Sequence, residues 1–107
     1  MIPSKGVTPH PGEMLLEEFL KPMGITQAAF ARYIDIDVAT MSSIINGKRD
    51  VTPTMALKFG QALGVSPETW VNLQSMHTFT KNREALRSKR QLPKIKPMPE
   101  VKELVEA

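Results

Sequence analysis

The chain has 107 residues, enough for one compact domain, and its 41% hydrophobic content can supply one core. It contains no cysteine, which excludes a disulfide framework and a cysteine-ligated zinc site. No apolar run resembles a signal peptide or reaches membrane-spanning length, so we expect neither secretion nor membrane insertion. The net charge of +3 is uneven, because residues 81–96 carry seven basic side chains against one acidic side chain.

The first predicted elements are an arm and an amphipathic helix. Residues 1–11 show no helical pattern of apolar side chains, and we expect them to form a flexible arm. A helix is predicted over residues 12–21, because apolar side chains recur on one face and Pro22 and Gly24 follow its end. Its opposite face is acidic, with Glu13, Glu17 and Glu18. These carboxylates form either an ordinary solvated surface or a patch that meets a basic partner.

Two short helices follow, separated by a tight turn. One is predicted over residues 27–34 with Thr26 as its N-cap, and the next over residues 38–46 with Asp37 as its N-cap. Each is too short to bury its apolar face alone, so each must pack on its neighbours. The second of the two leaves small and mostly polar side chains exposed. This is the layout of a DNA-reading helix-turn-helix.

Two further helices are predicted after this pair. Thr52-Pro53 opens a fourth helix that runs to about residue 63, where Gly64 ends it. Ser66-Pro67 repeats the pattern and opens a fifth helix. The fifth helix either breaks near Thr78 or continues to about Arg87.

The end of the chain differs from the body. Residues 92–99 contain three prolines and are expected to be extended, whereas residues 100–107 can form one or two helical turns. No segment alternates between apolar and polar residues as a strand does. The predicted fold class is therefore all-α.

Several short motifs of this chain match known families. The residues Thr26-Gln27, Ala31, Ile36 and Asn46-Gly47-Lys48 make residues 25–50 resemble the helix-turn-helix of phage repressors and Cro proteins, the XRE type. Three flanking stretches resemble HigA-type antitoxins of bacterial toxin–antitoxin operons: His10-Pro11-Gly12-Glu13-Met14-Leu15, Thr52-Pro53 and Ser66-Pro67-Glu68-Thr69-Trp70-Val71-Asn72-Leu73-Gln74. The resemblance implies a five-helix, lambda repressor-like domain over residues 12–80. A flexible arm, residues 1–11, would precede it, and a basic helix extension with a Pro-rich tail, residues 81–107, would follow.

The same resemblance implies a function. A HigA-type antitoxin binds double-stranded operator DNA as a homodimer, represses its own operon and neutralises a HigB-like toxin, a small basic RNase that cleaves mRNA. Such a protein works in the bacterial cytoplasm and is associated with the nucleoid through its operator. Two alternatives remain open: a stand-alone XRE-family repressor without a toxin partner, and a protein-interaction module whose helix-turn-helix no longer binds DNA.

The third predicted helix is where a DNA sequence would be read. Val38 and Ala39 suit contact with thymine methyl groups, and Ser42 and Ser43 can bond bases or phosphates. No Arg, Gln or Asn lies within residues 38–43, so specificity would depend on methyl contacts, water and DNA shape. The full set of candidate DNA contacts is Gln27, Asp37, Val38, Ala39, Thr40, Ser42, Ser43, Asn46, Lys48 and Arg49. Of these, Gln27, Lys48 and Arg49 are expected on phosphates, the alternative being ordinary solvated positions.

Other conspicuous residues have structural interpretations. Trp70, Leu73 and Met76 recur at helical spacing and belong either to the core or to a dimer seam. Glu13, Glu17 and Glu18 are candidates for contact with the toxin, as is the N-terminal arm. The alternative is the tail from Leu92 onward, although its basic charge suits the DNA backbone better than a basic toxin. The two histidines, His10 and His77, lie far apart in the sequence, and no metal-binding motif is present. We therefore expect no cofactor, and nothing in the sequence indicates an enzyme.

Overall fold

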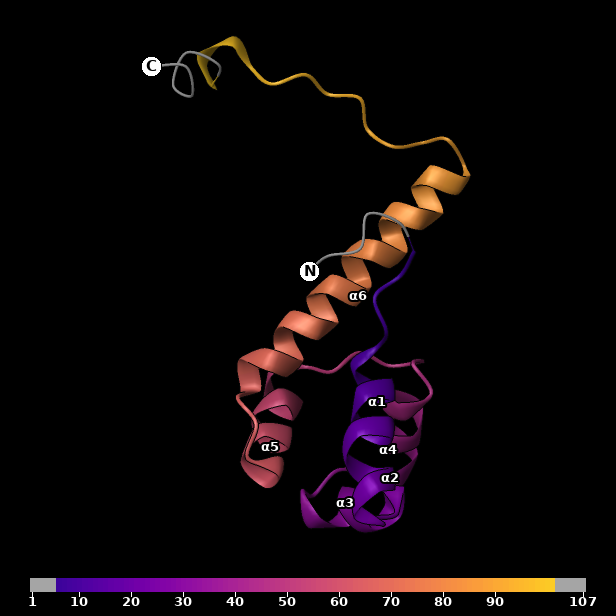
Figure 1. The fold of residues 1–107 in the computed structure, drawn as a ribbon, viewed down its shortest axis with the longest axis vertical. Helices are drawn as coiled ribbons and strands as arrows, with labels where there is room; N and C mark the ends of the chain where they lie inside the picture. The colour runs from indigo at the N-terminus through magenta and orange to yellow at the C-terminus, as the bar shows by residue number, and fades with distance from the viewer. Residues whose placement is uncertain (1–5, 102–107) are drawn as a thin grey trace.

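The computed structural model describes residues 6–101, and every regular element in this range is helical. In chain order they are α1 (Pro11–Met14), the π-helix η1 (Leu15–Leu20), α2 (Lys21–Met23), α3 (Gln27–Tyr33), α4 (Val38–Ile45), α5 (Pro53–Leu63) and α6 (Pro67–Ser88) (Figure 1). Because α1, η1 and α2 follow one another without a break, they count as one helical segment. Together with α3, α4, α5 and α6 they give the five predicted segments, and the all-α class is confirmed. Within residues 6–101, no helix is long and apolar enough to cross a membrane.

The first segment ends two residues later than predicted. It passes through Pro22, and Gly24 ends it in the left-handed conformation, with φ of 67°. A π-helical stretch precedes the proline, and the Lys21 N–H donates to the Leu16 carbonyl five residues back. Proline has no N–H to donate, and wide π turns are places where a helix tolerates such a defect. The helix therefore continues past Pro22, with a local change of its backbone hydrogen bonds from the α to the π pattern.

Three helix starts use the predicted side-chain caps, whereas Ser66 precedes α6 without a capping hydrogen bond and instead bonds the Glu68 carboxylate. The side chains of Thr26, Asp37 and Thr52 each accept a hydrogen bond from the backbone N–H three residues on, at 3.1, 3.2 and 3.2 Å. Between α3 and α4 the chain turns at Asp35, whose φ of 56° is left-handed. These local interactions set the length and angle of the helix-turn-helix.

All the helical segments share one core. Trp70 lies at its centre, fully buried, with its ring 5.3 Å from Phe59 and 5.6 Å from Phe19. The other buried apolar residues are Leu15, Leu20, Phe30, Ala31, Ile34, Met41, Ile44, Ile45, Val51, Ala56 and Phe59. Of the two interpretations of Trp70, the structure shows the core.

Gly12 brings α1 against α4. A Cβ at Gly12 would lie 1.9 Å from the carbonyl oxygen of Ile44, so the two backbones touch where they cross. Only glycine permits so close an approach. This contact fixes the position of α4 relative to the rest of the core.

Helix α6 takes the longer of the two predicted forms. It runs to Ser88, and its C-terminal half extends beyond the body of the protein (Figure 1). The chain before α1 lies along it. The Thr8 N–H donates to Thr80 Oγ1 at 2.8 Å, and His77 Nδ1 donates to the Thr8 carbonyl at 2.7 Å. The predicted flexible arm is thus hydrogen-bonded to α6 at Gly6 and Thr8, and two of the partners, Thr80 and Glu84, exist only because the helix continues past Thr78.

The tail follows the expectation in part. Residues 91–98 have no regular secondary structure and are exposed, as their prolines predict, and residues 99–101 form a short helical turn. The rest of the predicted terminal turn, residues 102–107, and the first five residues of the arm lie outside the described residues.

Candidate nucleic-acid interface

Helix α4 has one apolar side, which faces the core, and one exposed side. Its apolar side chains, Met41, Ile44 and Ile45, are buried in the core. Val38 is 42% exposed and Ala39 is exposed, while Thr40, Ser42 and Ser43 are half-buried at the edges. The side chains predicted to read DNA therefore lie on the outer side of a helix that is fixed from behind by Gly12. A helix held in this way can enter a major groove without rearrangement.

The start of α4 is set by Asp37. One oxygen of its carboxylate accepts the Thr40 N–H at 3.2 Å, as an N-cap does. DNA phosphates repel a carboxylate, so the role that this geometry supports for Asp37 is to fix the first turn of α4. Among the candidate DNA contacts, Asp37 is thus placed as the N-cap of α4.

The end of α4 presents two cations. The Lys48 N–H donates to the Ser43 carbonyl at 2.8 Å, and Gly47 takes a left-handed φ of 74°. Lys48 and Arg49 are exposed where the chain leaves this turn. Asn46 is exposed beside them, and its amide donates to Ser42 Oγ at 3.4 Å. Both ends of the outer side of α4 are thereby defined by hydrogen bonds within the chain.

Gln27 lies at the first residue of α3 and is half-buried. Gln27, Lys48 and Arg49 are the side chains of the helix-turn-helix that were predicted to contact DNA phosphates, and they are few. Asp37 and Asp50 partly offset the two cations. Such a sparse set of charges positions a protein on DNA without providing a large non-specific attraction.

A pair of histidines packs against the turn at Gly47 that follows α4, a contact that the sequence did not predict. His10 is buried and accepts the Gly12 N–H on Nδ1 at 2.9 Å, which caps α1. Its ring meets His77 of α6 edge to face, with centroids 4.9 Å apart. A Cβ at Gly47 would lie 3.7 Å from His10 Cγ, so the ring lies directly under the turn that ends in Lys48. The motif His10-Pro11-Gly12 was visible in the sequence, but its contact with position 77 is purely tertiary.

The environment of His10 disfavours its charged form. Burial lowers the pKa of His10, and nearby His77 lowers it further, against a smaller opposite effect of Asp50 and the backbone of Arg49. Within residues 6–101, the histidine pair is not part of any group of three or more His, Asp or Glu side chains that could hold a metal ion.

The remaining candidates lie on the other side of α1. Glu13, Glu17 and Glu18 are exposed around a groove of about 380 Å³ that Pro9, Met14 and Leu73 also line. Glu17 pairs with Lys21 at 2.8 Å. Leu73 and Met76 of α6 are half-buried, unlike Trp70.

Comparison with known proteins identifies a helix-turn-helix family and several relatives. A family model described as "Helix-turn-helix" matches residues 16–70. The Vibrio cholerae protein named Antitoxin HigA-1 is 48% identical over 63 residues, which cover 59% of each chain. A second relative, Virulence-associated protein I of Dichelobacter nodosus, is 34% identical over 64% of this chain, and the match spans 63% of its own length. This chain thus spans about three fifths of the length of these relatives.

Solved structures extend the likeness over most of the chain. The Pseudomonas aeruginosa antitoxin HigA, solved with the higBA promoter, superposes with a TM-score of 0.77 at 32% identity, covering 85% of this chain and 98% of that one. The antitoxin GraA in complex with its operator gives a TM-score of 0.75 at 30% identity, covering 92% and 98%.

Proposed function

This chain belongs to the helix-turn-helix family, and from that premise we propose that it is a HigA-type antitoxin. It binds operator DNA as a homodimer, represses its own operon and neutralises a HigB-like RNase in the bacterial cytoplasm. The observation that carries the proposal is the outer side of α4, which is exposed at Val38 and Ala39 and fixed from behind by the Gly12 contact. The likeness to antitoxins solved with promoter or operator DNA supports it.

The exposed residues of α4 make two kinds of contact with DNA. Val38 and Ala39 contact thymine methyl groups, and Ser42 and Ser43 bond bases or phosphates. Replacing Val38 and Ser43 with alanine should change the preferred operator sequence, at a cost of about 1–3 kcal/mol at the affected base pairs. Binding of both proteins to a set of operator variants measures this. An unchanged preference would reject the assignment of the reading face.

The homodimer follows from DNA geometry, because two recognition helices must enter major grooves about 34 Å apart. Helix α6 offers a seam on the side away from the core. Positions 72, 76, 79, 83 and 86 alternate in steps of four and three residues, the spacing of a helix–helix seam. Among them Phe79 is 53% exposed and Met76 and Leu86 are half-buried.

The groove lined by Glu13, Glu17 and Glu18, called the acidic groove below, is the proposed contact for the toxin. Within residues 6–101, the ion pairs involve Glu17 and Glu84 and leave Glu13 and Glu18 unpaired, so the charge of these two carboxylates is available to a basic partner. Changing both to lysine should abolish co-purification with the toxin and leave operator binding intact. Loss of both activities, or of neither, would contradict this assignment.

One experiment tests the function as a whole. The product of the adjacent reading frame is expressed together with this protein, and the purified protein is then used in a gel shift on the promoter of its own operon. Co-purification with a small basic protein and a promoter shift support the antitoxin. A promoter shift without any such partner would favour a stand-alone repressor, a possibility raised by the Escherichia coli transcriptional regulator YddM, which is 37% identical over 63% of this chain. Co-purification without a shift would favour a pure interaction module.

A further inference from the structure

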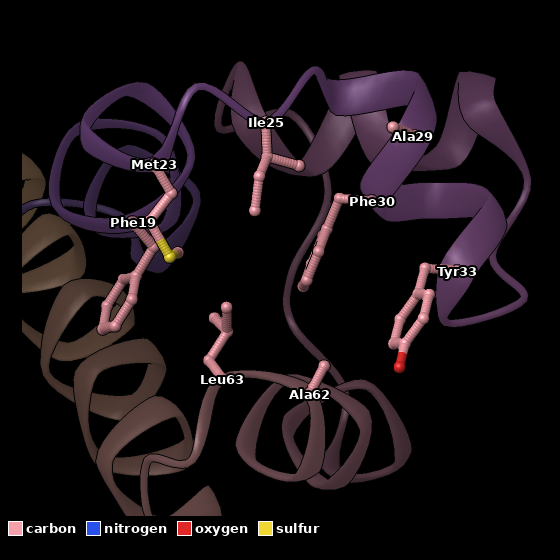
Figure 2. Close-up of a pocket in the computed structure, with 8 residues that line it drawn as sticks. All are labelled: Phe19, Met23, Ile25, Ala29, Phe30, Tyr33, Ala62 and Leu63. Atoms are coloured by element: carbon pink, nitrogen blue, oxygen red, sulfur yellow. The ribbon is translucent and has the colours of Figure 1, made fainter.

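An apolar groove remains open on the side of α3 that packs toward α5. It has a volume of about 510 Å³ and three aromatic walls, Phe19, Phe30 and Tyr33, with Leu63 and Ala62 opposite (Figure 2). Met23 at its edge is 51% exposed and Tyr33 is 83% exposed. Neither the DNA interface nor the acidic groove includes these side chains. The groove therefore has room for an apolar segment, and no segment of the same molecule fills it in the described residues.

The same chain carries an apolar segment without a partner. Leu92, Ile95 and Met98 are 36%, 87% and 64% exposed, and they are spaced three residues apart. The prolines of this tail favour the polyproline II helix, which has three residues per turn. In that conformation the three side chains form one continuous stripe, and Lys94 and Lys96 point elsewhere. Aromatic-lined grooves are the sites that bind such segments in other proteins.

The tail of the same molecule cannot fill the groove. Leu63 of the groove lies just before the start of α6, and the tail begins at its far end (Figure 1). The 22 residues of α6 span about 33 Å. The chain from Gln91 to Met98, at about 3.1 Å per residue, reaches back only about 25 Å. The stripe must therefore come from another copy.

We propose that the tail of one subunit packs its Leu92, Ile95 and Met98 stripe into the groove of its partner. The proposal rests on the homodimer of the proposed function. If the two α6 helices pack in opposite directions along the seam, the C-terminal end of one lies beside the start of the other. The tail then emerges next to the partner's groove. The exchange also removes three exposed apolar side chains of the tail from water.

Cross-linking tests the contact directly, because the protein has no cysteine of its own. Met98→Cys is prepared in one batch and Ala29→Cys, at the groove wall, in another. The batches are mixed, allowed to exchange subunits and oxidised, and mass spectrometry counts the mixed disulfide pairs. The matched control replaces Ala29→Cys with Ala39→Cys, an equally small change on the exposed side of α4. Mixed pairs should form at least about tenfold faster with Ala29→Cys than with Ala39→Cys, and equal rates would overturn the proposal.

Matched variants of the tail test whether the stripe contributes to the stability of the dimer. Ile95→Asp places a charge in the stripe, and Pro97→Asp places the same charge on another side of the same segment. By sedimentation equilibrium, Ile95→Asp should raise the dimer dissociation constant about tenfold, and Pro97→Asp should leave it nearly unchanged. Equal effects would refute the three-residue stripe. If the unmodified protein is a monomer, the homodimer fails as well, whereas a stable dimer without mixed disulfides refutes only the exchanged tail.

Discussion

Replacing Gly12 with alanine should separate α1 from α4. Alanine improves helix propensity by about 1 kcal/mol, which favours the variant. However, the new Cβ would lie 1.9 Å from the Ile44 carbonyl oxygen, 2.7 Å from its carbon and 2.9 Å from Ile45 Cα, whereas ordinary contacts begin at 3.4 Å. All three neighbours are backbone atoms, so no side chain can turn away. The helices must move apart by about 1.5 Å, at the place where Ile44 is fully buried.

The clash should outweigh the gain in helix propensity. Overpacking in a core costs about 1–3 kcal/mol and more against backbone, so we expect a net loss of about 2–4 kcal/mol. For a domain of this size, that lowers Tm by about 10–20 °C. Urea and thermal unfolding measure the loss, and Gly24→Ala is the control. A Cβ at Gly24 meets nothing within 4 Å, so its only cost is left-handed strain of about 1–2 kcal/mol. If Gly12→Ala is as stable as the unmodified protein, the backbone contact does not hold α4.

Three further predictions concern the core, the DNA contacts and pH. Trp70→Ala should lower the free energy of unfolding by about 3–5 kcal/mol, and a variant that melts normally but is monomeric would place Trp70 in a seam instead. Changing Lys48 and Arg49 to alanine should weaken binding to all DNA sequences alike and reduce the salt slope by about 1 for each phosphate that is no longer neutralised; a change in sequence preference would contradict this. The lowered pKa of His10 means that the unfolded chain takes up its proton first, so stability should fall as pH drops below about 6.5. In urea titrations His10→Asn, which can keep the cap but does not titrate, should show a smaller loss between about pH 7.5 and about pH 5.5.

The parts of the fold that the sequence predicts well are the locally determined ones. Thr26, Asp37 and Thr52 each cap a helix through a bond to a residue three positions on, so their effect can be recognised in a short window. The outer side of α4 was predictable for the same reason, because its apolar spacing and its turn residues lie within one short segment.

The parts that were missed depend on distant residues. The arm is bound through Thr8 to Thr80 and His77, some seventy positions away, and no periodicity of the arm indicates it. The passage of the first helix through Pro22 is a local exception: it depends on the adjacent π-helical stretch, which sequence rules for proline do not anticipate. The contact between His10 and His77 combines two isolated histidines that carry no signal separately.

That contact has a thermodynamic consequence. His10 touches the turn before Lys48 on one side and α6 on the other, so the arm, α6 and this turn share one buried ring. A protein partner that displaces the arm must disturb the same ring and change the affinity for DNA. Linkage then requires that DNA change the affinity for that partner by the same factor. Under the proposed function, the operator is thus an effector of partner binding as much as the partner is an effector of repression.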